Sequence, residues 1–116
     1  MTRVQEIAGP AGRLETILDE PPAEGGVNDD GLVERGRAGG LHAAVVLAHP
    51  HPQYGGTMHT KVVHQAAKAF TRIGCAVLRF NFRGVGRSEG AWDEGRGELD
   101  DFRAGVAFMR ARYPDA

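Results

Sequence analysis

Two apolar segments, each followed by a distinctive loop and then by a helical pattern, constrain the fold of this chain most strongly. The first runs from Ala43 to Ala48 and leads into the loop H-P-H-P-Q-Y-G-G; the second runs from Cys75 to Phe82 and leads into R-G-V-G-R-S-E-G. A repeated strand–loop–helix pattern is typical of an α/β protein with a parallel sheet. Because parallel strands end at the same edge of a sheet, both loops are expected to lie at one ligand-binding end.

The rest of the chain predicts one partial domain built around this β-α-β-α unit, which covers residues 41–116. Helices are predicted over residues 60–73, capped by Thr57 or Thr60, and over residues 98–113, where acidic residues such as Asp101 suit the helix dipole. The turn sequence G-P-A-G between residues 4–8 and 13–18 predicts a β-hairpin within residues 1–20. Residues 21–40 are rich in Gly, Pro and acidic residues, which predicts a flexible connector.

Composition argues against several classes of function. A net charge of −1 over 116 residues gives no electrostatic attraction to nucleic acid or to anionic membranes. The sequence shows neither a signal peptide nor an apolar run of the roughly 20 residues that a membrane helix needs, so a soluble, cytoplasmic protein is expected. The single cysteine, Cys75, cannot form an internal disulfide and is predicted to be a buried, inert thiol.

The sequence G-R-S-E-G around Ser88 matches the G-x-S-x-G pattern of a hydrolase nucleophile, but we predict that Ser88 is not catalytic. In a nucleophile elbow the strand runs directly into the first glycine and a helix begins at the serine. Here the strand is predicted to end near Phe82, and residues 89–95 follow as a loop. These hydrolases also place the base histidine after the serine, whereas the last histidine here is His64. Ser88 is expected to order its loop through backbone hydrogen bonds.

The same loop contains a variant of a dinucleotide-binding fingerprint, formed by Gly84, Gly86 and Gly90. A true fingerprint opens a helix whose N-terminus binds the pyrophosphate. The next helix is predicted to begin only near Gly97, so we predict no nucleotide cofactor.

The histidine–proline loop is the better candidate for a functional site. His49 and His51 alone do not make a zinc site, which needs at least three protein ligands, so no metal is predicted. The two prolines stiffen the loop and lack N–H groups, whereas His51, Gln53 and Tyr54 keep theirs. A stiff loop with such donors predicts an oxyanion hole; a rigid connection with a purely structural role is the alternative.

Residues 44–101 closely resemble a bacterial branch of the α/β-hydrolase superfamily. In that branch the first loop reads H-P-H-P-x-Y-G-G-T-M, and the second strand and loop read R-F-N-F-R-G-V-G-R-S-E-G; both are present here. The resemblance implies serine-dependent hydrolysis of esters or related acyl compounds, with an oxyanion loop from His49 to Tyr54. It also implies that the second loop shapes the site without supplying the nucleophile. The residues concerned are Asn81, Arg83, Gly84, Gly86 and Ser88.

The resemblance further implies an eight-stranded fold whose nucleophile elbow follows the fifth strand, with the acid and the histidine later still. The sequence stops before a fifth strand, so we expect the N-terminal half of an α/β-hydrolase fold that is inactive alone. The strand from Ala43 to Ala48 would then be an exposed apolar edge, which predicts a homodimer or a complementing C-terminal half. Two other functions stay open: a non-catalytic module that binds a small molecule or anion, and a metal-dependent hydrolase using His49 and His51.

Overall fold

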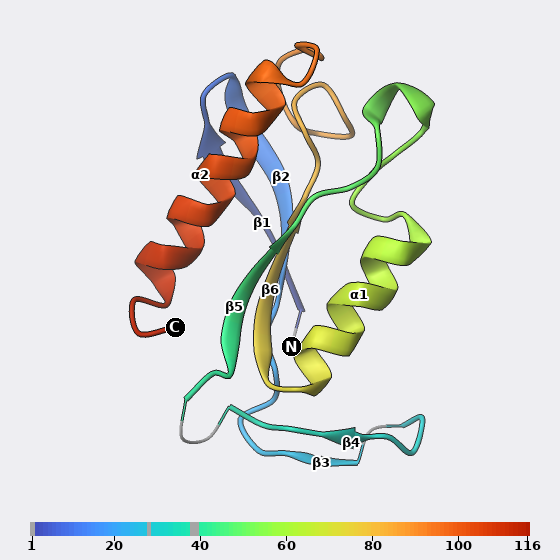
Figure 1. Ribbon diagram of the computed structural model, residues 1–116, viewed down its shortest axis with the longest axis vertical. Helices are drawn as coiled ribbons and strands as arrows, with labels where there is room; N and C mark the ends of the chain where they lie inside the picture. Colours follow the sequence, from blue (N-terminus) through green and yellow to red (C-terminus); the bar gives the residue numbers. More distant parts are fainter. Residues whose placement is uncertain (1, 28, 38–39) are drawn as a thin grey trace.

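The protein forms a four-stranded sheet with one helix on each face (Figure 1). The computed structural model describes residues 2–27, 29–37 and 40–116. Its main elements in chain order are β1 (Thr2–Gly9), β2 (Gly12–Asp19), β5 (Ala43–Leu47), α1 (Lys61–Arg72), β6 (Cys75–Phe80) and α2 (Arg96–Arg112). The order across the sheet is β1-β2-β6-β5, in which β5 and β6 are parallel and the other pairs antiparallel. The predicted hairpin followed by a β-α-β-α unit is confirmed.

The segment predicted as a connector, residues 21–40, contains two short strands as well as loops. β3 (Gly26–Val27) and β4 (Val33–Glu34) pair antiparallel in a separate ribbon beyond one end of the main sheet (Figure 1). The Arg35 amide donates a hydrogen bond to the Arg72 carbonyl at 2.7 Å, which ties the ribbon to the end of α1. Strands of two residues are too short to show a periodic pattern, so they could not be predicted. Residues 28, 38 and 39 of this segment lie outside the described residues.

Both helices lie close to their predicted bounds. Thr60 occupies the N-cap position of α1, but its side-chain oxygen accepts the Thr57 amide at 3.1 Å instead of a helix amide. α2 begins two residues earlier than predicted, because the Glu98 carboxylate accepts the Asp93 amide at 2.9 Å and the Gly95 amide at 3.0 Å. Glu98 therefore caps the helix from its third position. Among the described residues, no helix has both the length and the apolar character needed to cross a membrane.

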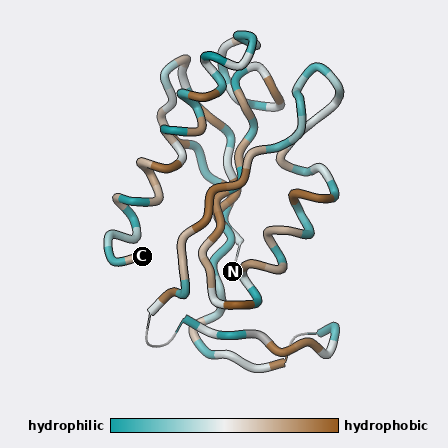
Figure 2. Tube along the Cα trace, viewed as in Figure 1, coloured by the Kyte–Doolittle hydropathy of each residue, from teal (hydrophilic) through white to brown (hydrophobic). Residues whose placement is uncertain are grey.

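The core lies on both faces of β6, whose six residues are all buried. Figure 2 shows the most hydrophobic stretch of the chain in the middle of the molecule, along β5 and β6. Leu78 and Met109 belong to the cluster between the sheet and α2, whereas Val77 and Ala67 belong to the cluster under α1. A central strand covered on both faces explains why its apolar run is nearly continuous.

The two edges of the sheet differ in chemistry. The edge strand β1 carries exposed charged residues, among them Arg3 and Glu6, and charges of this kind discourage pairing with another strand. β5 at the other edge consists only of Ala, Val and Leu, and each residue is partly exposed. In the described part of the chain no strand covers its outer side.

Candidate functional site

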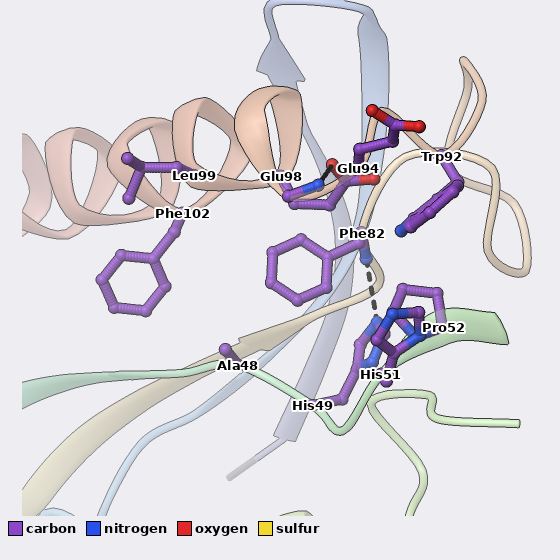
Figure 3. Close-up of a pocket in the computed structure, with 11 residues that line it drawn as sticks. Ala48, His49, His51, Pro52, Phe82, Trp92, Glu94, Glu98, Leu99 and Phe102 are labelled. Carbon is purple, nitrogen blue, oxygen red and sulfur yellow. Dashed lines mark hydrogen bonds between the residues drawn. The ribbon is translucent and has the colours of Figure 1, made fainter. Parts of the chain in front are cut away.

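The loops that follow β5 and β6 meet at the end of the sheet opposite the β3–β4 ribbon (Figure 1). His49 joins them: its Nε2 atom accepts the Phe82 amide at 3.1 Å, and its Nδ1 atom lies 2.7 Å from the Pro50 carbonyl (Figure 3). A ring nitrogen that bonds a carbonyl carries a proton, and one that accepts an N–H does not. Buried His49 is therefore a neutral imidazole protonated on Nδ1. Its role here is to hold the two loops together, and both nitrogens are unavailable to a metal or a substrate.

The neutral state of His49 makes the stability of the fold depend on pH. Burial lowers the pKa of His49 below the ordinary value of 6.5, and the bond to the Pro50 carbonyl only partly opposes this effect. Below about pH 6.5, His49 is therefore protonated more readily in the unfolded chain than in the folded chain. The contribution of neutral His49 to the stability of the fold is fully present above that pH. It is lost as the pH falls through the pKa of His49 in the folded chain.

We therefore expect the urea midpoint of unfolding to decrease between pH 7.5 and pH 5.5. The His49→Gln variant is expected to be less stable at every pH, because it loses the bridge between the loops, but to show a flatter pH dependence over this range. Urea titrations of both proteins at a series of pH values measure this difference. An unchanged slope in His49→Gln would assign the effect to another group.

The rest of the first loop forms the short 3-10 turn η1 (Pro52–Tyr54). Its amides are largely used within the loop: Nδ1 of His51 accepts the Gln53 amide at 3.1 Å, and the His51 carbonyl accepts the Tyr54 amide at 3.1 Å. Gln53 and Tyr54, which the sequence offered as oxyanion donors, are thus already bonded. The His51 amide meets no acceptor within the described residues. A Cβ at Gly56 would lie 1.9 Å from the Pro50 carbonyl oxygen, so this tight path requires glycine.

Ser88 in the second loop is buried, and its hydroxyl is fully engaged with the backbone. Its Oγ donates to the Asn81 carbonyl at 2.6 Å and accepts the Glu15 amide at 2.9 Å. Residues 89–95 form turns and irregular structure, and α2 begins only at Arg96. This geometry agrees with a serine that orders its loop; that it is not a nucleophile stays a prediction.

Asn81 connects three segments beneath the second loop. Its Oδ1 accepts the Met58 amide at 2.8 Å, and its Nδ2 donates to Oε1 of Glu15 at 2.8 Å. The same Glu15 oxygen accepts the Arg87 amide at 2.8 Å. Gly86 has φ of +55°, and a Cβ there would lie 2.6 Å from both Asn81 Nδ2 and Glu15 Oε1. A larger residue at position 86 would therefore be strained by its positive φ and would have to displace the Asn81 and Glu15 side chains.

Arg83 fixes the start of the second loop to α2 through a two-pronged ion pair. Its Nε and Nη2 atoms bind the Asp101 carboxylate at 3.1 and 2.9 Å, and its backbone amide donates to the same carboxylate at 3.0 Å. Asp101 is fully buried. The bonds to Asp101 raise the pKa of Arg83, so the guanidinium stays charged. From the sequence, Asp101 was expected to interact only with the helix dipole; its ion pair with Arg83 was not predicted.

A depression of about 480 Å³ lies between the two loops and the start of α2 (Figure 3). Its walls are mostly apolar, and His51 lies on the side of the first loop. The apolar lining residues are Ala48, Pro52, Phe82, Trp92, Leu99 and Phe102. Across the described residues, no group of three His, Cys, Asp or Glu side chains is placed to hold a metal ion. The mostly apolar lining therefore favours binding of an uncharged organic group.

Comparison with known proteins relates this arrangement to a family. No family model matches the sequence. An uncharacterized protein of Rickettsia prowazekii is 48% identical over 73 residues, which are 63% of this chain and 30% of that protein. An α/β serine hydrolase without a lid from Xanthomonas campestris superposes with a TM-score of 0.80 at 36% identity, over 97% of this chain and 46% of the other.

A second solved structure gives the same result. An α/β serine hydrolase homologue from Coxiella burnetii superposes with a TM-score of 0.76 at 35% identity, over 97% of this chain and 47% of that chain. The chain thus spans less than half the length of the solved structures it matches. Because the likeness extends over nearly all of this sequence, the chain is a homologue of the α/β serine hydrolases, and its fold matches the N-terminal part of theirs.

Proposed function

We propose that this chain provides the oxyanion-binding half of a serine hydrolase site that acts on esters or related acyl compounds. The observation that carries the proposal is the His51 amide, which has no acceptor in the described residues and belongs to a loop lining an apolar pocket. In α/β hydrolases one oxyanion donor comes from the loop after the third strand, and the other follows the nucleophile. β5 is the third strand of the main sheet in chain order.

The proposed role of the His51 amide is to stabilise the negative charge that develops on the substrate carbonyl oxygen. A substrate carbonyl directed at the His51 amide gains negative charge as a nucleophile attacks it, and the hydrogen bond strengthens at that moment. The flanking prolines, Pro50 and Pro52, restrict the backbone, so little reorganisation is needed. The attacking serine, its histidine base and the supporting acid are proposed to come from residues outside this sequence.

A fluorophosphonate probe, which reacts with activated serines, tests this division of roles. We expect no labelling of the purified chain, because the Ser88 hydroxyl is bonded to backbone groups. A fusion of this chain to the part of the Xanthomonas hydrolase that follows the matched region should be labelled at one serine of the added part. Labelling of the chain alone that disappears in Ser88→Ala would contradict the proposal, as would a folded but unlabelled fusion.

We further propose that the partner supplying these residues pairs with β5. The edge strand β5 has no charged residue, and a groove lies beside it on each face of the sheet. A groove of about 300 Å³ lined by Ala44 and Val46 lies on the α2 side, and one of about 140 Å³ lined by Leu47 lies on the α1 side. A strand with apolar side chains on both faces, as in a complementing C-terminal half, fits such an edge.

Without that partner, we expect the chain to self-associate through β5. Val46→Lys should shift the protein toward the monomer in sedimentation velocity, because a charge on an edge strand blocks pairing. Val4→Lys is the matched control: Val4 lies on the opposite edge strand and is 74% exposed, so it should change nothing. A monomeric wild-type chain at micromolar concentration would contradict this expectation.

A further inference from the structure

We infer that Glu15, in the β1–β2 hairpin, is a positioning residue for the first loop and acts on it through Asn81. The first loop is the one that follows β5 and carries the His51 amide. The inference rests on the proposed function only for its effect on turnover. The placement of the loop is tested separately, on the chain alone.

The turn of the β1–β2 hairpin lies at the same end of the sheet as the two loops and is fitted to the second one (Figure 1). The Arg13 carbonyl accepts the Glu89 amide at 2.8 Å, and the Glu89 carboxylate accepts the Arg13 amide at 2.7 Å. A Cβ at Gly12, where φ is +124°, would lie 2.8 Å from Oε1 of Glu89. The Glu15 carbonyl accepts the Asn81 amide at 2.9 Å. The hairpin therefore holds the backbone just before the second loop and near the end of that loop.

The Glu15 side chain determines how the Asn81 side-chain amide is turned. Asn81 is only 2% exposed, and its side chain has a donating nitrogen and an accepting oxygen. An ionised carboxylate only accepts hydrogen bonds, so Oε1 of Glu15 binds Nδ2 of Asn81, at 2.8 Å. Oδ1 of Asn81 is then left to accept the Met58 amide, also at 2.8 Å. Without the Glu15 carboxylate, the buried Nδ2 atom would lose the partner that fixes this orientation.

The first loop is anchored at both ends to consecutive residues of the chain. At the start of the loop, Nε2 of His49 accepts the Phe82 amide at 3.1 Å. At its end, Oδ1 of Asn81 accepts the Met58 amide. The His49 anchor does not involve Glu15, whereas the Asn81 anchor depends on it. Loss of the Glu15 carboxylate should therefore loosen one end of the loop and leave the other end in place.

A loosened end would affect the His51 amide through the loop itself. The Gly56 amide donates to the His51 carbonyl at 3.2 Å, so the end of the loop is bonded to the residue that carries the proposed oxyanion donor. Such a donor must lie about 2.7–3.1 Å from the oxyanion, and a misplacement of about 1 Å can lower a rate about 10²-fold. Movement at Met58 is therefore expected to lower kcat and to leave KM nearly unchanged.

Hydrogen exchange of single amides, followed by NMR in the purified chain, tests the placement of the loop without turnover. In Glu15→Ala the Met58 amide should exchange at least about tenfold faster, while the Met109 amide inside α2 should keep its rate. Glu15→Gln should behave like the wild type, because its side-chain oxygen can still accept Nδ2 of Asn81. An unchanged rate at Met58, or equal increases at Met58 and Met109, would overturn the inference.

Hydrolysis of a nitrophenyl ester by the fusion with the Xanthomonas hydrolase segment tests the effect on the reaction. Glu15→Ala should lower kcat about 10–100-fold with KM changed less than about twofold, and Glu15→Gln should retain most of the activity. Glu6→Ala is the matched control. Glu6 is an exposed carboxylate on β1 that pairs with Arg13 at 3.4 Å, so its removal should change neither constant.

A double variant tests whether Glu15 acts through Asn81. If it does, Glu15→Ala should lower kcat no further in an Asn81→Ala background, whereas independent effects would multiply. Multiplied effects, or a wild-type kcat in Glu15→Ala, would overturn the inference. An inactive fusion together with faster Met58 exchange in Glu15→Ala would refute the proposed function and still support the placement of the loop by Glu15.

Discussion

Replacing His51 with proline is expected to lower kcat for ester hydrolysis by about 10²–10³-fold in the fusion with the Xanthomonas hydrolase segment. The substitution deletes the backbone N–H proposed to bind the oxyanion, and loss of one such donor has an effect of this size. The backbone tolerates the change, because φ of His51 is −48°, near the value that proline imposes. Steady-state kinetics with a nitrophenyl ester provide the measurement.

The control for this experiment is His51→Ala, which keeps the N–H and removes only the imidazole. That variant loses the acceptor for the Gln53 amide, so a small change in activity is expected, below about tenfold. KM should be similar in both variants, because the oxyanion bond forms mainly in the transition state. If His51→Pro were as active as His51→Ala, the His51 amide would not be the donor.

Asp101→Ala is expected to destabilise the chain by about 3–5 kcal/mol, the usual effect of removing one partner of a buried ion pair. Asp101 is fully buried, and the Arg83 side chain is only 12% exposed, so the guanidinium would be left without its counter-charge. The Arg83 amide would lose its acceptor as well. Since small domains are stable by about 5–15 kcal/mol in total, urea denaturation should show a large shift.

The neighbouring residue provides a matched control. Asp100 pairs with Arg103 at 3.2 Å, but both side chains are more than half exposed, so Asp100→Ala should change the free energy of unfolding by less than about 1 kcal/mol. The double variant Arg83→Met with Asp101→Leu removes both charges and should recover part of the lost stability. A shift in Asp101→Ala no larger than in Asp100→Ala would contradict the structural role assigned to the buried pair.

The elements that could be predicted from sequence are those with a long pattern or a strong turn. β6 is a continuous apolar run because both of its faces are covered, and the β1–β2 hairpin follows from its turn residues. β3 and β4 have two residues each, so no period could mark them. The place of the two loops at one end of the sheet follows from the parallel pairing of β5 and β6.

The contacts within the site could be predicted less well, because they join residues far apart in the chain. Asn81 was named through the family resemblance, but its partner Glu15 lies 66 residues earlier, in a hairpin whose polar residues look like ordinary surface. The Gln53 amide donates a hydrogen bond to Nδ1 of His51, and this bond depends on the orientation of the imidazole ring. No pattern of residues in the sequence predicts that orientation. Individual hydrogen bonds of a loop follow from three-dimensional packing, whereas the location of the loop follows from the strands.

The strand order of the sheet has a consequence for the newly synthesised chain. β6 lies between β2 and β5 yet is made after both, and the Asp19–Arg79 ion pair joins residues 60 positions apart. Until residues 75–80 leave the ribosome, the hairpin and β5 each lack their neighbour. Pairing over such separations slows folding. The nascent polypeptide therefore passes through an interval in which its least polar strand is unprotected, and chaperone capture is most useful at that stage.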